Sequence, residues 1–166
     1  DILPHMLHEL RAGSPDIQIT LLVATGCHRG TTAEELRLKL GAQIADQEQI
    51  VVHDAFDTQK NVQIGILPSG APLVIDRVAA EADLLLAEGF IEPHFFAGFS
   101  GGRKSVLPGI CARQTVFGNH CGALIADTHA RTGILDDNPI HQDMVAAARM
   151  AGLAYIVNVV INEHKQ

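Results

Sequence analysis

The chain has few aromatic residues and few cysteines, and it lacks any long apolar run. Its 166 residues include no tryptophan, one tyrosine and three cysteines (Cys27, Cys111, Cys121). Because three is an odd number and no CxxC pair occurs, the cysteines indicate free thiols in a reducing cytoplasm rather than a disulfide framework. Residues 17–24 form one of the longest apolar stretches, far short of the ~20 residues that cross a bilayer. The sequence therefore predicts a cytoplasmic protein without a membrane span.

Positive charge is also scarce, since 12 Lys and Arg face 19 Asp and Glu and the net charge is −7. Such a field repels phosphate backbones, so nucleic acid is not expected as a partner. The chain begins without Met, and it shows no basic segment or cleavage site of a signal peptide. We therefore expect the natural start of the protein to lie upstream of residue 1.

The composition that is present, 47% hydrophobic and 19% charged residues, is that of a globular protein and excludes collagen and disordered chains. Its length suits one domain over residues 1–166. Short apolar runs predict strands, and longer amphipathic stretches with capping residues predict helices. The expected strands are residues 17–24, 50–53, 62–67, 72–75, 83–87 and 153–161; the expected helices are residues 31–41, 76–82, 139–151 and one that begins near 108.

Strands that alternate with helices predict the α/β class. We expect an open, mostly parallel sheet with helices on both faces, a Rossmann-like layered domain, whose ligand site lies at the carboxyl ends of the strands. Two helices have clear signals at their ends. Thr31 or Thr32 can cap the first, and Asn138 precedes Pro139 at the start of the last.

The first candidate segment is the turn at residues 25–30, Thr-Gly-Cys-His-Arg-Gly, between a predicted strand and a predicted helix. The N-terminus of a helix offers free backbone N–H groups to an anion, and His28 and Arg29 would project over the same crevice. The alternative is an ordinary surface turn in which His28 is solvated.

The second segment, residues 93–105, is rich in glycine and ends in Arg103 and Lys104. Its glycines allow the backbone to approach a ligand, and its cations stand out in an acidic protein. It is not a P-loop, because Arg103 separates Gly102 from Lys104. The segment also contains three phenylalanines, which would not line a freely mobile exposed loop: Phe95, Phe96 and Phe99. We expect these rings to belong to the core rather than to line an apolar pocket.

The third segment, residues 115–121, contains His120 and Cys121, both potential ligands of a soft metal. No second ligand lies at a helical or CxxC spacing, so any metal must be shared across the fold. The cysteines are expected to be small buried apolar residues. The remaining histidines have no glycine-rich or turn context and are expected to be surface or capping residues: His5, His8, His53, His129, His141 and His164.

Together these segments resemble the nickel-dependent lactate racemase family. The resemblance is carried by residues 25–36, 93–110 and 119–120, followed by residues 137–140 and 158–160. The order and spacing of two histidines, a lysine and a third histidine agree with the family's motif over nearly the whole chain.

The resemblance implies a racemase or epimerase of 2-hydroxy acids, acting by reversible hydride transfer from the substrate α-carbon through a 2-keto acid. The cofactor it implies is a nickel-pincer nucleotide, a nickel pyridinium-3,5-bisthiocarboxylic acid mononucleotide. Carried over by position, His28 and His94 would be the acid/base pair, Lys104 the covalent tether and His120 the protein ligand of nickel. The residues implied to hold the nucleotide phosphate are Ser100, Gly101 and Gly102.

Two parts of the family pattern are missing from this chain, an upstream Thr-Arg-Pro motif and a downstream second domain. The groups that hold the substrate carboxylate would lie there. We therefore expect an N-terminal, cofactor-bearing domain that pairs with its own C-terminal domain and a small 2-hydroxy acid, and that is inactive alone. One alternative is a non-catalytic nucleotide- or phosphate-binding module. A zinc hydrolase built on His28, His94 and His120 is disfavoured because no carboxylate base stands at a helical spacing from them.

Overall fold

The computed structural model describes residues 2–160, and its first part is a parallel pair of strands joined by helices. Arg11 on the first helix and Glu48 after the third form a two-point ion pair with N–O distances of 2.8 and 2.7 Å. Strand β1 pairs in parallel with β2, so that Leu21 lies opposite Ile50. The elements of this part are α1 (Leu3–Gly13), β1 (Thr20–Val23), α2 (Ala33–Leu40), α3 (Ala42–Gln47) and β2 (Gln49–Val52).

Helix α2 begins and ends where its sequence predicts. The Thr32 hydroxyl accepts a hydrogen bond from the Glu35 backbone N–H, and the Glu35 carboxylate accepts one from the Thr32 N–H, which completes a capping box. The helix ends at Leu40, and the next residue is Gly41, whose φ of +81° suits glycine. Thr32 is therefore the cap, rather than Thr31.

An antiparallel hairpin and a short helix follow. Strand β3 (Asn61–Ile66) pairs with β4 (Pro72–Asp76), with a shift in register between Gln63 and Gly65. Helix α4 (Arg77–Ala80) starts directly after β4, because the Asp76 carboxylate accepts a hydrogen bond from the Val78 N–H and caps it.

The last part is one long excursion between two strands that pair in parallel, β5 (Leu85–Ile91) and β8 (Leu153–Val160). The Asn138 side chain caps helix α7 by accepting from the N–H groups of Ile140 and His141, as the sequence predicts. Six elements lie between the two strands: β6 (Pro93–His94), β7 (Gly98–Phe99), the 3₁₀ helix η1 (Gly102–Ser105), α5 (Arg113–Asn119), α6 (Gly122–Ile125) and α7 (Pro139–Met150).

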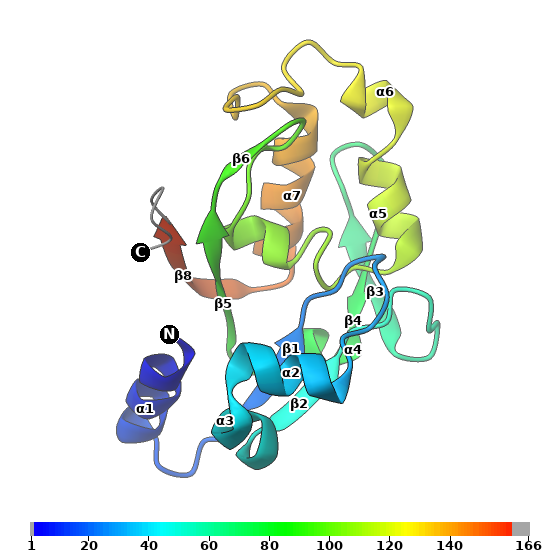
Figure 1. Ribbon diagram of the computed structural model, residues 1–166. Coiled ribbons are helices and arrows are strands. Elements are labelled where there is room, and N and C mark those ends of the chain that lie inside the picture. Colours follow the sequence, from blue (N-terminus) through cyan, green and yellow to red (C-terminus); the bar gives the residue numbers. More distant parts are fainter. Residues whose placement is uncertain (1, 161–166) are drawn as a thin grey trace.

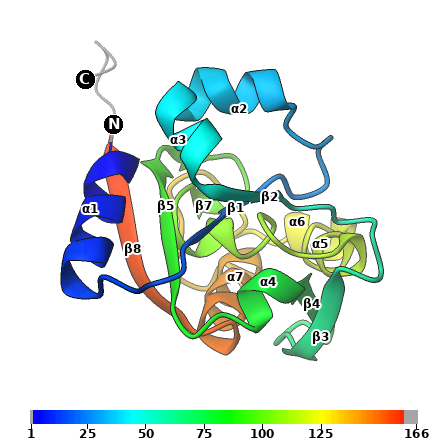
Figure 2. The same ribbon diagram turned by 90° about the horizontal axis from the view of Figure 1, so that it is seen from below.

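Helices lie on both sides of the strands, which confirms the predicted α/β class. Figures 1 and 2 show α2 and α3 on one side of β1 and β2, with α7 on the opposite side. Within residues 2–160 the strands form four two-stranded sheets, of which β1–β2 and β5–β8 are parallel and β3–β4 and β6–β7 antiparallel. The described strands are thus hydrogen-bonded in separate pairs rather than in one continuous open sheet.

The hydrophobic core lies between β4, α7 and the segment that joins η1 to α5. Leu73 and Ile75 from β4 meet Ile140 and Met144 from α7, and all four are fully buried. Burial of apolar side chains from distant segments gives the main stabilising free energy and fixes the excursion on the hairpin. The segment between η1 and α5 contributes Val106, Leu107, Ile110 and Cys111.

Some predicted boundaries were wrong. The first strand starts at Thr20 rather than at residue 17, and β5 runs on through residue 91 because β8 pairs with it along its length. The helix expected near residue 108 begins at Arg113, because residues 106–111 form buried turns instead. The end of the predicted last strand at Ile161 lies outside the described residues. No helix among residues 2–160 is long and apolar enough to span a bilayer.

Candidate functional site

The ring of Phe96 is the centre of the candidate site, because three of the predicted residues surround it. The His94 ring meets it edge-on at 4.6 Å between centroids, and the His120 ring does so at 4.9 Å. The Lys104 Nζ lies over the same ring, 5.9 Å from its centroid. Phe96 is only 7% exposed, so it holds the three polar side chains at the edge of the core.

A tight hairpin positions His94 and Phe96. Strands β6 and β7 pair His94 with Gly98, and the Ala97 N–H donates to the His94 Nδ1 at 3.3 Å. Gly98 has a φ of +80°, and a Cβ there would lie 2.4 Å from the Ile134 carbonyl oxygen. Only glycine fits this close approach of two backbone segments.

Lys104 lies on η1, and its amine is partly withdrawn from water. Burial, followed by the positive charge of Arg103, lowers the pKa of Lys104 to about 8. The Gly109 N–H donates to the Lys104 carbonyl at 3.1 Å, which fixes the turn behind it. A larger share of this amine than of an ordinary lysine is therefore neutral and nucleophilic near neutral pH.

His120 ends helix α5, where its backbone N–H donates to the Val116 carbonyl at 2.8 Å. Its Nδ1 atom is buried and has no hydrogen-bond partner among the described residues. Burial lowers the pKa of His120 to about 4, helped by the charges of Lys104 and His94. The ring is therefore neutral at physiological pH, the form in which an imidazole binds a metal.

His94 is affected in the same direction. Burial, then the charges of Lys104 and Arg103, lower the pKa of His94 below its ordinary value. His94 is thus neutral at pH 7 and can act as a base.

The glycine-rich segment makes bonds to its own scaffold. The Ser100 hydroxyl donates to the Phe90 carbonyl and accepts from the Glu92 N–H, both at 2.8 Å. The Gly102 N–H donates to the Asn158 Oδ1 at 3.2 Å. The hydroxyl proton of Ser100 is thus used within the protein, while Ser100, Gly101 and Gly102 still line a cavity of about 560 Å³.

His28 lies on the turn after β1, and its side chain is exposed. It takes no part in the ring contacts around Phe96, so the structure does not bring it together with the other three residues. The turn is nevertheless tied to the Lys104 segment, because the Gly26 N–H donates to the Gly109 carbonyl at 2.8 Å. Arg29 was expected to face the crevice, but it forms an ion pair with Glu35 instead.

The predicted exposure of two histidines and one phenylalanine was wrong. His53 was expected at the surface, but it is 1% exposed, and its Nδ1 lies 2.9 Å from the Asp76 carboxylate. His141 is half-buried, where its Nδ1 accepts a hydrogen bond from Arg103. Phe95 was expected in the core and is 73% exposed.

The His53–Asp76 pair is the feature that sequence reasoning missed. The His53 Nε2 lies 3.0 Å from the Cys111 carbonyl, and the Thr25 hydroxyl donates to the His53 carbonyl at 2.8 Å. The pair therefore connects β2, β4, the turn before His28 and the segment behind Lys104. The one available signal was the position of His53 and Asp76 at the ends of two predicted strands.

The protein supplies few metal ligands by itself. Over the described range 2–160, no three His, Cys, Asp or Glu side chains are grouped to hold a metal ion. A zinc site built on His28, His94 and His120 is thus not formed. All three cysteines are free, with Cys111 buried and the others partly buried.

Comparison with known families decides the relationship. The sequence model of one protein family, the lactate racemase N-terminal domain, matches residues 1–133. The chain belongs to this family. The matched range includes the whole cluster around Phe96.

Individual relatives agree with this assignment. The domain is 54% identical over 164 residues to a lactate racemase from Thermoanaerobacterium thermosaccharolyticum, covering 98% of this chain and 38% of that protein. It is 56% identical over 165 residues to a lactate racemase from Lactiplantibacillus plantarum, covering 99% of this chain and 39% of that protein. The chain therefore spans about two fifths of the length of these relatives.

Solved structures show the same fold. The lactate racemase apoprotein from T. thermosaccharolyticum superposes with a TM-score of 0.97 at 53% identity, over 98% of this chain and 39% of that one. A protein from Thermotoga maritima superposes with a TM-score of 0.78 at 25% identity, over 95% of this chain and 42% of that one.

Proposed function

We propose that residues 1–166 are the cofactor-bearing N-terminal domain of a lactate racemase-like enzyme that racemises or epimerises a 2-hydroxy acid. The observation that carries this proposal is the grouping of His94, Lys104 and His120 around one buried ring. The relatives' names and the family match support the same activity. In this proposal, residues outside this chain complete the site, because the chain spans only about two fifths of the length of its relatives.

The residues present fit a nickel-pincer nucleotide. The buried Nδ1 of His120 has no partner among the described residues, and a desolvated acceptor without a partner is costly unless something binds it. We therefore assign His120 as the protein ligand of nickel. Lys104, with its pKa near 8, would be the covalent tether, and Ser100, Gly101 and Gly102 would lie along the phosphate.

When bound, this group would supply a reversible hydride acceptor for the substrate α-carbon, so that the 2-hydroxy acid could pass through its 2-keto acid. The protein must then remove the hydroxyl proton and give it back from either side of the substrate. Neutral His94 can hold that proton on one side. We assign His28, which is exposed on the turn after β1, to the other side.

The partners follow from the same proposal. The enzyme would act on a small 2-hydroxy acid such as lactate, and it would need its own C-terminal domain to hold the substrate carboxylate. Three free cysteines support a cytoplasmic location.

The test is co-expression of this chain with the enzymes that make the cofactor, followed by intact mass and nickel analysis. We expect an adduct on Lys104 and bound nickel, both absent in a Lys104→Ala variant. His120→Ala should lose nickel, and Lys60→Ala, at an exposed lysine, should behave like the parent chain. An unmodified Lys104 in the parent chain would favour a non-catalytic nucleotide- or phosphate-binding module.

The chain alone should not racemise its substrate even when loaded. The measurement is chiral chromatography after incubation of the loaded chain with D-lactate. Formation of L-lactate above the level of the Lys104→Ala control would show that the domain is active without further residues.

A further inference from the structure

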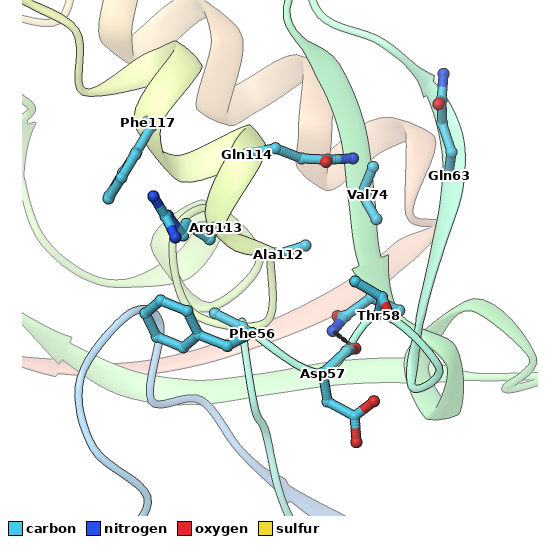
Figure 3. A pocket seen from close by; sticks show the side chains of 11 residues that line it. Phe56, Asp57, Thr58, Gln63, Val74, Ala112, Arg113, Gln114 and Phe117 are labelled. Carbon is cyan, nitrogen blue, oxygen red and sulfur yellow. Dashed lines mark hydrogen bonds between the residues drawn. The ribbon is translucent and has the colours of Figure 1, made fainter.

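A second cavity, of about 640 Å³, lies apart from the cluster around Phe96 and shares no residue with it. It opens between the start of α5, the β3–β4 hairpin and the loop after β2, as Figure 3 shows. Its lining combines apolar side chains with one cation, Arg113, one carboxylate, Asp57, and several neutral polar groups. The residues are Ala55, Phe56, Asp57, Thr58, Asn61, Gln63, Val74, Ala112, Arg113, Gln114 and Phe117.

Arg113 is held between two phenyl rings. Its guanidinium carbon lies 5.0 Å from the centroid of Phe117 and 5.9 Å from that of Phe56, and Figure 3 shows the side chain between the two rings. The N–H donors of a guanidinium lie in its plane, at its edge, and contacts with aromatic rings restrict the side chain. The two rings therefore restrict the Arg113 side chain.

No acidic group of the described chain uses that edge. The Arg113 side chain makes no ion pair or hydrogen bond to any of residues 2–160. The nearby Asp57 is engaged elsewhere, because it accepts from the Gln59 N–H at 2.9 Å and pairs with Lys60 at 3.6 Å. In Figure 3 its carboxylate points away from Arg113.

The wall of the cavity is fixed by hydrogen bonds to backbone carbonyls. The Arg113 N–H donates to the Ala55 carbonyl at 2.9 Å, which joins α5 to the loop that carries Phe56. The Asn61 Nδ2 donates to the Asp54 and Asp57 carbonyls at 2.9 and 2.7 Å. The Phe56 and Arg113 sides of the cavity are thus preorganised, which lowers the entropic cost of binding.

We propose that this cavity binds a small organic carboxylate, with the carboxylate on the edge of Arg113 and an apolar body against Phe56 and Phe117. A guanidinium edge presents two parallel N–H donors that match the two oxygens of a carboxylate. Thr58 and Gln114 line the same cavity and offer neutral hydrogen-bonding groups to the remainder of the ligand. The cavity shares no residue with the proposed racemase centre, and the proposal does not depend on that assignment.

The experiment is an NMR titration of the ¹⁵N-labelled chain with benzoate, benzamide and acetate. Benzoate should shift the backbone amides of Phe56, Arg113 and Phe117 in a saturable manner, with a dissociation constant of about 1–10 mM, as expected for a ligand of this size. Acetate should bind more weakly because it lacks the ring. Benzamide, which has the same shape without the charge, should not saturate.

Variants test the role of the guanidinium. Arg113→Gln should weaken benzoate at least ~10-fold, since a hydrogen-bonded charge is lost, and Arg113→Lys should fall between the two because it keeps the charge without the fork. Arg131→Gln, at an exposed arginine that lines neither cavity, is the matched control and should bind as the parent chain does. Unchanged amide positions outside the cavity show that each variant is folded.

Four results would overturn the proposal. The first three are binding of benzoate at the amides of His94 and Lys104 instead, equal affinity in Arg113→Gln, and no saturation. A fourth is tighter binding at the same amides of a capped Ala-Ala-Asp-Ala-Ala peptide, which would assign the cavity to an acidic side chain of a protein partner.

Discussion

The amine of Lys104 is distinguished from the exposed lysines of the chain by its position over Phe96 and beside Arg103. Both burial and like charge disfavour its protonated form. The environment that lowers this pKa is made by the fold and not by neighbours in sequence alone. A local motif identified the residue, but its reactivity follows from tertiary packing.

We expect the Lys104 amine to titrate near pH 8, because burial and the charge of Arg103 lower its pKa to about 8 from the ordinary lysine value of 10.5. Between these two values the unfolded chain binds a proton that the folded chain does not, so stability should rise with pH across this window. The measurement is NMR titration of the chain after reductive ¹³C-methylation, with Lys39 and Lys60 as exposed references.

The control is Lys104→Met, which removes the titrating group and should flatten the rise in unfolding free energy between pH 8 and 10.5. If the Lys104 signal titrates together with the reference lysines, the proposed withdrawal of the amine from water is wrong.

At the scale of elements, caps and glycines position the site. Asn138 is fully buried, and it both caps α7 and donates to the Phe96 carbonyl at 2.8 Å and the Ile134 carbonyl at 3.0 Å. One side chain thus connects the last helix to the ring at the centre of the cluster. The cap was predictable from the sequence, whereas the link to Phe96 was not.

Asn138→Ala should lower the free energy of unfolding by about 2–4 kcal/mol, because it removes a cap and leaves buried carbonyls without a donor. Asn138→Asp keeps the acceptor but places a buried carboxylate oxygen against the Phe96 and Ile134 carbonyls, so its loss should be at least as large. Urea unfolding measures both. Thr32→Ala, at the more exposed cap of α2, should cost about 1 kcal/mol; equal losses at the two caps would contradict the role given to the buried donor.

Gly98→Ala should be more damaging than Gly70→Ala, although both glycines have positive φ. A Cβ at Gly70 meets nothing within 4 Å, while one at Gly98 collides with the Ile134 carbonyl. We expect about 1 kcal/mol at Gly70 and about 2–4 kcal/mol at Gly98. Thermal unfolding compares the two, and a similar loss would show that the β6–β7 hairpin can move away.

Local signals explain which elements were predictable. Helix α2 carries its capping box, and α7 carries Asn138 and Pro139, so both were placed within a residue or two. Strand β5 was placed too early, because Glu88 and Gly89 interrupt its apolar pattern, yet pairing with β8 extends it. Similarly, the motif named His94, Lys104 and His120, but nothing local showed that Phe96 brings them together.

At the scale of the whole molecule, the His53–Asp76 pair joins parts of the fold that are distant in sequence. Both side chains are at most 2% exposed. The His53 ring faces a carboxylate on one side and the Cys111 carbonyl on the other. The pair therefore holds the β1–β2 unit, the β3–β4 hairpin and the segment behind Lys104 in one arrangement.

Asp76→Asn and His53→Gln should each lower the free energy of unfolding by about 3–5 kcal/mol, because either change leaves the other buried partner uncompensated. The double variant should lose less than the sum of the two. Chemical denaturation in a double-mutant cycle measures this coupling, and strictly additive losses would show that the two residues act independently.

The parallel pairing of β5 with β8 also orders the events of folding. Every residue of the cluster around Phe96 lies between these strands, and η1 packs on β8 through the bond from Gly102 to Asn158. The ladder can close only after β8 has been synthesised, and pairing over so long a loop is slow to form. A ribosome-bound chain that ends before β8 therefore lacks the strand against which η1, the helix that carries Lys104, packs.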